Sequence, residues 1–508
     1  MKFSYQPPQA VLGDHAHHAT AAAGNAAVVE EAIGVLKDCV NGDSDITTIL
    51  LKAAAGAGKS YALRRMVGEL VTTTAVRHVG VTSFTNNQAR ALVQGLTAEL
   101  GRERVGWLVG KDHFAKLEPD LLREVNASTS VANFSDEVAV VVGTSHRLGA
   151  PSELGRLRDA FGKEEFPFEV LLVDEAWQLP EHLFAKVAKH APIVVGVGDV
   201  GQLPPLEIGK NPWRGDERYN PYRAWPHRRA ELPTTWAREL PTVWRPTAEQ
   251  IGLWQAFYPD WDSLTSVAAP GDRALRTTHE VRRFAEVVDL VGTGVPVLLE
   301  VDGLPDGESA DVDQPLTELA ESLIEELVRA ELQLERELYA GDGSLSGERD
   351  LQGLHDGGDP MIVFLATRNE TVDNATEAVE RLTEEYGLPA GAVAASTVDS
   401  WQGQTNGITV ALHPLSGADQ LDEFNSAFGR LAVVCTRATH GLVVLARSGL
   451  DDLLGSAAAR SGTPFGEPGE RQLPRQTHQR ILRSFARARL VLEPGDLETS
   501  DREEHPEA

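Results

Sequence analysis

The feature that most constrains this chain is an eight-residue string between a predicted strand and a predicted helix. Residues 53–60 read Ala-Ala-Ala-Gly-Ala-Gly-Lys-Ser; they follow a β-branched run at 46–51 and precede a helical pattern that begins near Ser60. Small residues let backbone N–H groups wrap phosphate oxygens, and the N-terminus of the next helix adds partial positive charge. The string matches a phosphate-binding loop except that Ala53 replaces the first glycine. A chance Gly/Ala turn is the alternative, which the flanking strand and helix disfavour.

The residue types of this loop predict how it would hold a nucleotide. Gly56 and Gly58 would let the backbone approach the phosphates. Lys59 would reach the β- and γ-phosphates, and the Ser60 hydroxyl would ligate Mg²⁺. The sequence therefore predicts ATP and Mg²⁺ as cofactors.

Two later strand ends carry the side chains that such a loop needs. Asp174 and Glu175 follow an apolar strand at 170–174, which predicts Asp174 in the Mg²⁺ shell and Glu175 beside the attacking water. Gln202 lies in the string Gly-Asp-Val-Gly-Gln-Leu-Pro-Pro at 198–205, after the strand predicted at 193–198. A neutral amide can sense a γ-phosphate by hydrogen bonding without neutralising it. A solvated strand end and an ordinary loop are the alternatives.

The apolar pattern along the chain predicts an α/β protein with more than one domain. Continuous apolar runs at 46–51, 77–82, 138–143, 170–174 and 193–198 alternate with helical stretches, which is typical of a parallel sheet buried on both faces. The alternation resumes after 246, with strands at 295–301, 361–365, 408–412 and 441–446, a long helix at 316–339 and a linker at 341–359. A chain of 508 residues also exceeds one hydrophobic core.

Composition limits the cellular setting and sets a problem of charge. No apolar run approaches the roughly 20 residues of a membrane helix, and the scattered Cys39 and Cys435 fit a reducing cytoplasm. We expect a cytoplasmic protein without a membrane partner, and a composition rich in Ala, Gly and Arg suggests a bacterial source. The net charge of −28 opposes binding to a polyanion. Either the acidic excess lies away from one basic groove, or the partner is not a nucleic acid.

Taken in order, the motifs resemble those of superfamily 1 helicases over nearly the whole of residues 46–450. Gly-Asp-x-x-Gln-Leu-x-Pro is the third motif of that family. The matching strings in the second half are Trp244-Arg-Pro, Ala366-Thr-Arg-Asn, Thr397-Val-Asp-Ser-Trp-Gln-Gly-Gln and Gly429-Arg through Thr436-Arg-Ala. The resemblance implies two tandem RecA-like P-loop domains whose parallel sheets are flanked by helices. It implies the bounds 1–45 (N-terminal helical segment), 46–210 (first domain, small insertion at about 95–137), 211–450 (second domain) and 451–508 (polar tail with a basic helix).

The same resemblance implies roles for residues of the second half. Arg245 and Arg437 would stabilise charge on the γ-phosphate from the opposite domain, so that hydrolysis depends on closure. Gly403 would lie at the nucleotide. Thr85, Asn86, Thr144 and Thr397 are implied to contact the nucleic-acid backbone, and helix capping is the alternative for each.

The closest branch by resemblance is the 5′→3′ superfamily 1B, especially its nonsense-decay helicases, and some features are RecD-like. Thr405 stands where that branch has Glu, and Val28, Val29 and Glu30 stand where the family carries an adenine-reading glutamine. Two further segments could bind nucleic acid: an aromatic and arginine-rich stretch at 211–246, which could equally be packing, and a basic stretch at 480–489, which could equally dock on its own protein.

Two functions follow from these patterns. The first is an ATP-dependent helicase or translocase moving along single-stranded nucleic acid, DNA favoured over RNA. The alternative is a nucleotide-dependent switch or assembly ATPase of a repair or defence complex, with a protein partner and no unwinding activity. A small-molecule kinase explains neither Gln202 nor the second-half motifs.

Overall fold

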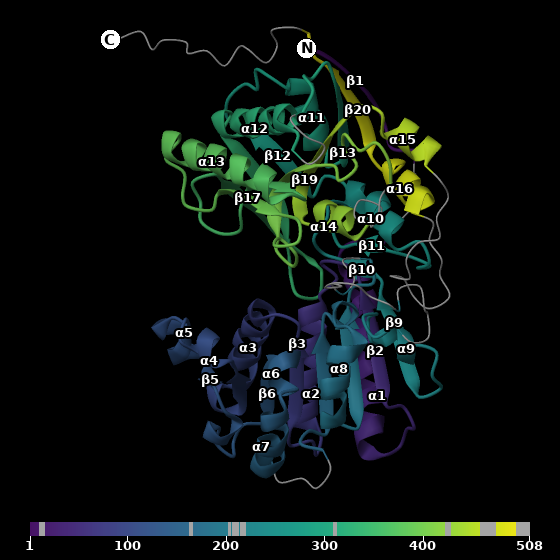
Figure 1. Cartoon of the computed structure of the whole chain (residues 1–508), viewed down its shortest axis with the longest axis vertical. Helices are drawn as coiled ribbons and strands as arrows, with labels where there is room; N and C mark the ends of the chain where they lie inside the picture. The colour runs from purple at the N-terminus through teal and green to yellow at the C-terminus, as the bar shows by residue number, and fades with distance from the viewer. Residues whose placement is uncertain are drawn as a thin grey trace. The chain divides into compact units, whose positions relative to one another are not determined.

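The computed structural model describes residues 1–9, 16–161, 166–201, 205, 213, 220–307, 312–421, 428–457 and 474–493. These residues form two compact units, coloured along the chain in Figure 1. The N-proximal unit contains Ala23–Thr242. The C-proximal unit contains Met1–Ala22, Val243–Ser461 and the described residues 474–493.

The N-proximal unit is built on one fully parallel sheet in the order β5-β4-β6-β3-β7-β8-β2-β9. Its central strands are buried along their whole length, because helices cover both faces. The strands are β2 (Thr48–Ala53), β3 (Val79–Ser83), β4 (Val105–Leu108), β5 (Asn126–Ser128), β6 (Val140–Thr144), β7 (Val170–Asp174), β8 (Ile193–Gly198) and β9 (Thr235–Leu240).

The helices of this unit pack their apolar stripes on that sheet (Figure 1). Helix α2 buries Leu63, Met66, Val67 and Leu70, spaced as one face of a helix requires. The helices are α1 (His18–Asn41, which starts in the C-proximal unit), α2 (Lys59–Thr73), α3 (Asn86–Leu100), α4 (Lys111–Phe114), α5 (Pro119–Glu124), α6 (Ser145–Leu148), α7 (Pro151–Phe161), α8 (Glu181–Val187) and α9 (Pro226–Arg229). The region 95–137 adds β4 and β5 to the edge of the same sheet.

Strand order decides which loops meet at the carboxyl edge of this sheet. β8 lies between β2 and β7, and all three are parallel. The loops after Ala53, Asp174 and Gly198 therefore leave the sheet at neighbouring positions on one edge.

The C-proximal unit contains a second large sheet in the order β1-β20-β13-β19-β18-β16-β17. It is parallel except for β1, which pairs antiparallel with β20. The strands are β1 (Lys2–Gln6), β13 (Val297–Asp302), β16 (Ile362–Ala366), β17 (Val393–Thr397), β18 (Asn406–Leu412), β19 (Ala438–Arg447) and β20 (Ala486–Val491). The helices are α10 (Ile251–Phe257), α11 (Ala285–Gly292), α12 (Gln314–Arg329), α13 (Asn369–Glu385), α14 (Gly429–Cys435), α15 (Leu450–Ser456) and α16 (Pro474–Leu482). The predicted α/β fold with two mainly parallel sheets flanked by helices is confirmed.

The predicted long helix 316–339 is wrong in its second half. Helix α12 ends at Arg329, and Glu331 has a left-handed φ of 49°. Strand β14 (Leu332–Tyr339) follows and forms an antiparallel sheet with β12 (Arg273–Thr277) and β15 (Leu345–Gly353), so part of the predicted linker 341–359 is also strand. The Leu332/Leu334 alternation has the period of a strand, and arginines on β12 and β15 pair with the glutamates of β14. β10 (Thr242–Val243) and β11 (Thr265–Ser266) form a small separate sheet.

The basic helix predicted in the tail, which contains the basic stretch 480–489, is also divided. Helix α16 ends at Leu482, and β20 follows with Ala486, Ala488 and Leu490 buried. Its arginines pair with acids of β13: Arg487 with Glu300 at 2.6 Å and Arg489 with Asp302 at 2.5 Å. The stretch therefore docks on its own unit, as one of the two sequence interpretations held, and Arg480 donates to the carbonyl of Ala256. Within the described ranges, none of the helices has both the length and the apolar character needed to cross a bilayer.

Buried histidines predict an acid-sensitive C-proximal unit. Burial lowers the pKa of His413 and of His440 to about 3. Because each group binds its proton more readily when unfolded, the stability it contributes is present above about pH 6.5 and is lost as pH falls towards 3, at about 1.4 kcal/mol per pH unit and histidine. We expect His440→Gln to reduce the pH dependence of the free energy of unfolding, measured with urea between pH 6 and 4. The expected reduction is about 1.4 kcal/mol per pH unit, which corresponds to one proton. An unchanged slope would contradict this assignment.

Candidate nucleotide-binding site

The loop between β2 and α2 has the backbone conformation that anion binding needs. Gly56 and Gly58 adopt left-handed φ values of 66° and 88°, which glycine reaches without a Cβ clash. Lys59 and Ser60 are the first residues of α2, and Gly58 provides no side-chain cap. The first N–H groups of α2 therefore have no side-chain partner from the cap and point towards the loop, where a phosphate can accept them.

Asp174 and Glu175 stand at the carboxyl end of β7, two strands from the loop. Glu175 has φ 49° and ψ 48°, a left-handed conformation that is costly for a residue with a Cβ. Gln178 donates to Glu175 Oε2 at 3.2 Å. A strained backbone held by its surroundings is common at functional sites, and here it turns the glutamate towards the loop lysine.

Lys59 faces acidic side chains that follow β7 and β8. Its Nζ lies 3.3 Å from Glu175 Oε1 and 3.8 Å from Asp199 Oδ2. Burial, together with the negative charge of Glu175, raises the pKa of Asp174 to about 7, although Lys59 opposes the shift. One ammonium group thus faces carboxyl groups of Asp174, Glu175 and Asp199 in a mostly buried place.

This charge balance fits a divalent cation with a nucleotide. Hard cations such as Mg²⁺ prefer oxygen ligands and are commonly held by one or two protein groups together with substrate phosphates. Asp174 and Ser60 are oxygen donors of that kind beside the loop. A cation would offset the negative charge of the carboxyl groups around Asp174, and the phosphates bound with it would interact with Lys59.

Sequence analysis did not identify Asp199 as a site residue, although it lies in the string that predicted Gln202. Asp199 is 2% exposed and accepts a hydrogen bond from Gly201 N at 2.9 Å. The feature that could have identified Asp199 is its position directly after β8, the strand that lies between β2 and β7. Gln202 itself lies outside the described residues.

In the C-proximal unit, the structure brings Arg245 and Arg437 to neighbouring positions. Arg245 Nη1 donates to the carbonyl of Thr436 at 2.8 Å, and Thr436 precedes Arg437. Arg437 is 1% exposed and donates to Val433 O, Thr436 Oγ1 and Gln404 O. The arginine predictions therefore fall on one cluster within this unit, in which Arg437 is held by carbonyl and hydroxyl oxygens.

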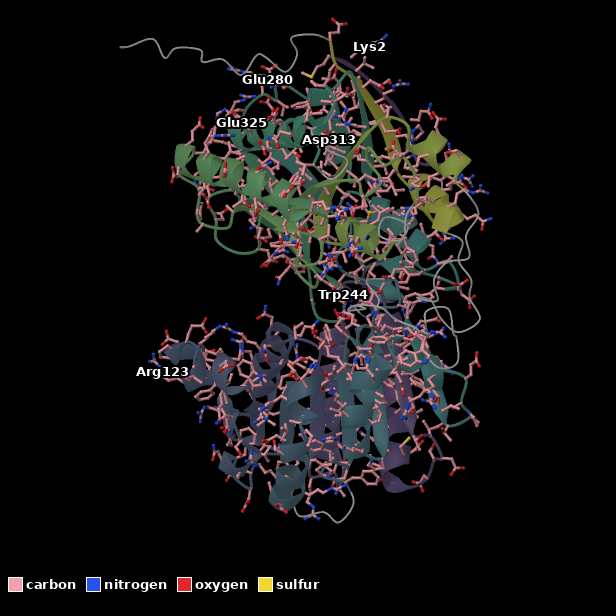
Figure 2. The ribbon with its side chains drawn as sticks, viewed as in Figure 1. Lys2, Arg123, Trp244, Glu280, Asp313 and Glu325 are labelled. Atoms are coloured by element: carbon pink, nitrogen blue, oxygen red, sulfur yellow. The ribbon has the colours of Figure 1, made fainter. Side chains whose placement is uncertain are left out.

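Arg273 organises this cluster and was missed by the sequence analysis. It donates to the carbonyls of Trp244, Arg245 and Thr439, and burial lowers its pKa to about 10. Trp244 is labelled in Figure 2. A guanidinium carries donors in a planar fork, which suits clamping several carbonyls at once. Nothing in the local sequence distinguishes Arg273 from a surface arginine.

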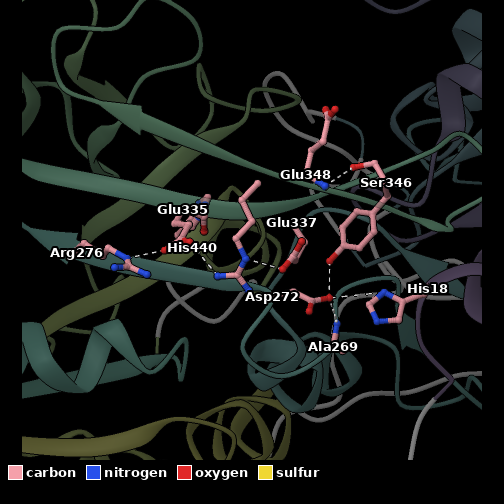
Figure 3. Close-up of polar contacts among 11 residues, drawn as sticks. His18, Ala269, Asp272, Arg276, Glu335, Glu337, Ser346, Glu348 and His440 are labelled. Atoms are coloured by element: carbon pink, nitrogen blue, oxygen red, sulfur yellow. Dashed lines mark hydrogen bonds and ion pairs between the residues drawn. The ribbon is translucent and has the colours of Figure 1, made fainter.

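A polar network fixes the residue before Arg273. Asp272 accepts from Ala269 N at 2.8 Å and from Tyr339 Oη at 2.6 Å, and it lies 3.6 Å from His18 Nδ1 (Figure 3). Burial and the hydrogen bond to Asp272 raise the pKa of Tyr339. The start of α1 and the end of β14 thereby hold β12 in place.

Gly403 and Thr397 lie near the carboxyl end of β17. Gly403 has a left-handed φ of 85°. The hydroxyl of Thr397 donates to Ser400 Oγ at 2.8 Å and accepts from Ser400 N at 3.3 Å, so it closes the turn that leads to Gly403. Trp401 Nε1 donates to Asn406 Oδ1 and ties this turn to β18.

The predicted nucleic-acid contacts of the N-proximal unit lie at adjacent strand ends. β3 and β6 are neighbours, with Ser83 opposite Thr144. Thr85 forms a capping box with Gln88 at the start of α3, where Asn86 is the first helical residue. Thr144 caps α6 by accepting from Arg147 N. Helix capping, the alternative role, is thus present at both threonines, and contact with nucleic acid stays a prediction.

Part of the aromatic stretch 211–246 is packing. Trp225 is fully buried and stacks on Phe184 at a centroid distance of 4.1 Å, with the Arg229 guanidinium 5.0 Å from the Phe184 ring. Trp213 is 42% exposed and lies 6.5 Å from the ring of Tyr222. Residues 206–212 and 214–219 lie outside the described chain.

Some glutamates of the C-proximal unit are exposed, and others are paired with arginines. Glu280 and Glu325 are exposed on its outer surface (Figure 2). Acids of the β12–β14–β15 sheet are instead paired, as Glu335 is with Arg276 and Arg349. Of these glutamates, Glu280 and Glu325 are thus solvated and Glu335 is neutralised by arginines.

Comparison with known proteins adds a domain class. A family model described as "AAA domain" matches residues 37–207, which include the loop after β2 and the ends of β7 and β8. These residues are therefore similar to AAA domains. None of the curated proteins matches this chain.

Several solved structures are similar to the chain as a whole. Arterivirus nonstructural protein 10 (helicase), solved with DNA, is 14% identical over 80% of this chain and 62% of that one, with a TM-score of 0.38. The PRRSV helicase is 12% identical over 91% and 70%, with a TM-score of 0.38. The Escherichia coli DEAH/RHA helicase HrpB is 12% identical over 85% and 43%, with a TM-score of 0.39. The chain thus spans less than two thirds of the first and third of these proteins, and similarity of this degree does not establish a shared activity.

The contacts of Lys59 predict a specific loss of nucleotide binding. Lys59→Ala should weaken Mg-nucleotide binding roughly tenfold to hundredfold, the range of a charge-assisted hydrogen bond, as measured by titration with a fluorescent ATP analogue. Lys37→Ala is the matched control, because Lys37 lies on α1 and pairs with Glu69 at 2.8 Å. Equal affinity of Lys59→Ala and wild type would exclude the loop as the phosphate site.

Proposed function

We propose that this protein is an ATP-dependent motor of the superfamily 1 helicase type, which couples hydrolysis to movement along single-stranded nucleic acid. The observation that carries the proposal is that one chain contains two groups of residues suited to nucleotide hydrolysis. Lys59 faces Glu175 and Asp199 in a P-loop unit, and Arg245 and Arg437 adjoin each other in a second α/β unit of the same chain. A phosphate loop with arginines on a separate unit is the arrangement in which domain closure controls hydrolysis.

The residues of the N-proximal unit would bind the nucleotide and orient the attacking water. Lys59 would hold the β- and γ-phosphates, and Ser60 and Asp174 would hold Mg²⁺, which supplies charge stabilisation on the transferred phosphoryl group. Glu175 lies close enough to Lys59 to share one pocket with it and would orient or deprotonate water. Gln202 would sense the γ-phosphate, and Gly403 would lie at the nucleotide on the other unit.

The arginine cluster would complete the site on closure. Arg245 is half-buried and directed by Thr436, whereas Arg437 must exchange carbonyl contacts for phosphate oxygens. Both would stabilise negative charge that develops as the γ-phosphate leaves.

Single-stranded DNA is favoured over RNA as the track, with 5′→3′ movement and a superfamily 1B relationship. Thr85, Asn86, Thr144 and Thr397 lie at or just after strand ends, where hydroxyl and amide groups can contact a phosphate backbone without reading sequence, and this supports a nucleic-acid track. The buried thiols Cys39 and Cys435 support a reducing setting, the bacterial cytoplasm in our proposal.

The alternative is a nucleotide-dependent switch or assembly ATPase with a protein partner. The net charge of −28 favours it, because a polyanionic track is repelled by such a surface.

The two functions differ in what stimulates hydrolysis. We expect the ATPase rate to rise strongly with single-stranded DNA, less with single-stranded RNA and least with duplex, and the affinity to fall as salt increases. The measurement is a steady-state ATPase assay at several salt concentrations. A rate that no nucleic acid changes, but that a protein partner changes, would favour the switch.

The arginine cluster predicts a defect in turnover. Arg245→Ala should lower kcat about a thousandfold with little change in nucleotide affinity, as expected for a group that acts on the transition state. Arg276→Ala is the control, since Arg276 is 61% exposed and pairs with Glu335 in the same unit. A loss of affinity without loss of kcat would instead give Arg245 a ground-state role.

A further inference from the structure

Asn25 is a buried amide that no motif assigned to the site. It lies about two turns into α1, and only 8% of it is exposed. Its Nδ2 donates to Ala57 O at 2.9 Å and to Thr242 O at 2.7 Å, and its Oδ1 accepts from Thr242 N at 2.9 Å. All three contacts are with backbone groups of the N-proximal unit.

The contact with Ala57 orients the phosphate loop. The carbonyl of Ala57 and the N–H of Gly58 belong to one planar peptide and point in opposite directions. By holding that carbonyl on α1, Asn25 aims the N–H of Gly58 the other way. Gly58 has a left-handed φ and precedes Lys59, so this N–H belongs to the donors available to a phosphate.

The contacts with Thr242 hold the point where the chain leaves the unit. Thr242 is the last residue of the N-proximal unit, and Arg245 follows three positions later. Strands β2 and β9 are paired, with Ala53 opposite Leu240. The phosphate loop and the exit segment therefore leave neighbouring strands together, and Asn25 bridges them just beyond the sheet.

Asparagine suits this bridge better than similar side chains. An amide offers two N–H donors and a carbonyl acceptor, and the three contacts use both kinds of group. Aspartate would place a carboxylate against two carbonyl oxygens, and leucine would leave buried carbonyl and N–H groups without this partner.

We propose that Asn25 is a positioning residue that couples the phosphate loop to the exit segment 242–245, so that nucleotide binding alters the segment that carries Arg245. The inference rests on the proposed function. When a phosphate accepts hydrogen bonds from the N–H groups of the loop, the peptide between Ala57 and Gly58 moves relative to the Asn25 amide. The same amide holds both backbone groups of Thr242, so the shift reaches the exit segment.

The experiment is hydrogen–deuterium exchange by mass spectrometry on the full chain, with and without saturating MgATPγS. The variants are Asn25→Asp and, because a charge could disturb folding, Asn25→Ala. The control is Asn133→Asp, since Asn133 contacts Ser128 at the opposite edge of the same sheet. Peptides covering 53–60 and 240–246 are followed, together with MgATPγS affinity.

Three results are expected. Without nucleotide, the exchange at 240–246 is roughly tenfold faster in Asn25→Ala than in wild type, because the Thr242 N–H loses its acceptor. Asn25→Asp keeps an acceptor oxygen for this N–H but loses the donors to Ala57 O and Thr242 O. In wild type and in Asn133→Asp, MgATPγS changes exchange in both peptides. In the Asn25 variants, saturating nucleotide still changes 53–60 but not 240–246, and affinity falls roughly tenfold.

The outcomes separate this inference from the proposed function. If wild type binds MgATPγS and the response at 240–246 survives in both Asn25 variants, the coupling is overturned while the ATPase assignment stands. Unchanged exchange at 240–246 in nucleotide-free Asn25→Ala overturns the Asn25–Thr242 contact whatever the nucleotide result. Failure of wild type to bind nucleotide at all overturns both proposals.

Discussion

The ammonium group of Lys59 is held between carboxylates at the ends of neighbouring parallel strands, and much of the N-proximal unit serves this contact. Glu175 reaches Lys59 from a left-handed backbone, and Asp199 is almost fully buried beside it. Burial and the negative charge of Glu175 raise the pKa of Asp174, so ionising all the carboxyl groups around Lys59 at once is unfavourable. Such a site is stabilised by whatever brings cation and phosphate together, which is the chemical reason to expect a metal–nucleotide complex.

Parallel strand order makes that contact possible. Because β8 is inserted between β2 and β7, residues separated by more than a hundred positions in sequence leave the sheet at one edge. The C-proximal unit uses a different device. Arg273 clamps carbonyls on both sides of Arg245, and Arg245 is bonded to the residue before Arg437. A buried guanidinium thereby holds the segment on which the arginine predictions depend.

Several elements were predictable because their signal is local. Continuous apolar runs predicted the buried parallel strands, and the small residues after β2 predicted a loop, in which the structure shows left-handed glycines. Strands β14 and β20 were mistaken for helix, since their charged residues favour helices in isolation. Only cross-strand partners such as Arg276, Arg349 and Glu300 make these sequences better as strands. Asp199, Arg273 and Asn25 escaped detection for a related reason: each acts on a residue far away in sequence.

From local residue types the sequence predicted a phosphate-binding loop, because such a loop needs particular residues at consecutive positions, and runs of apolar residues predicted the parallel α/β architecture. The tertiary structure alone decided which acids face Lys59, which arginines share a cluster and where the Asn25 amide is bonded. Those pairings depend on strand order and on the direction of buried side chains. Neither is encoded by local spacing, since contacts between distant segments form only when the whole sheet is assembled.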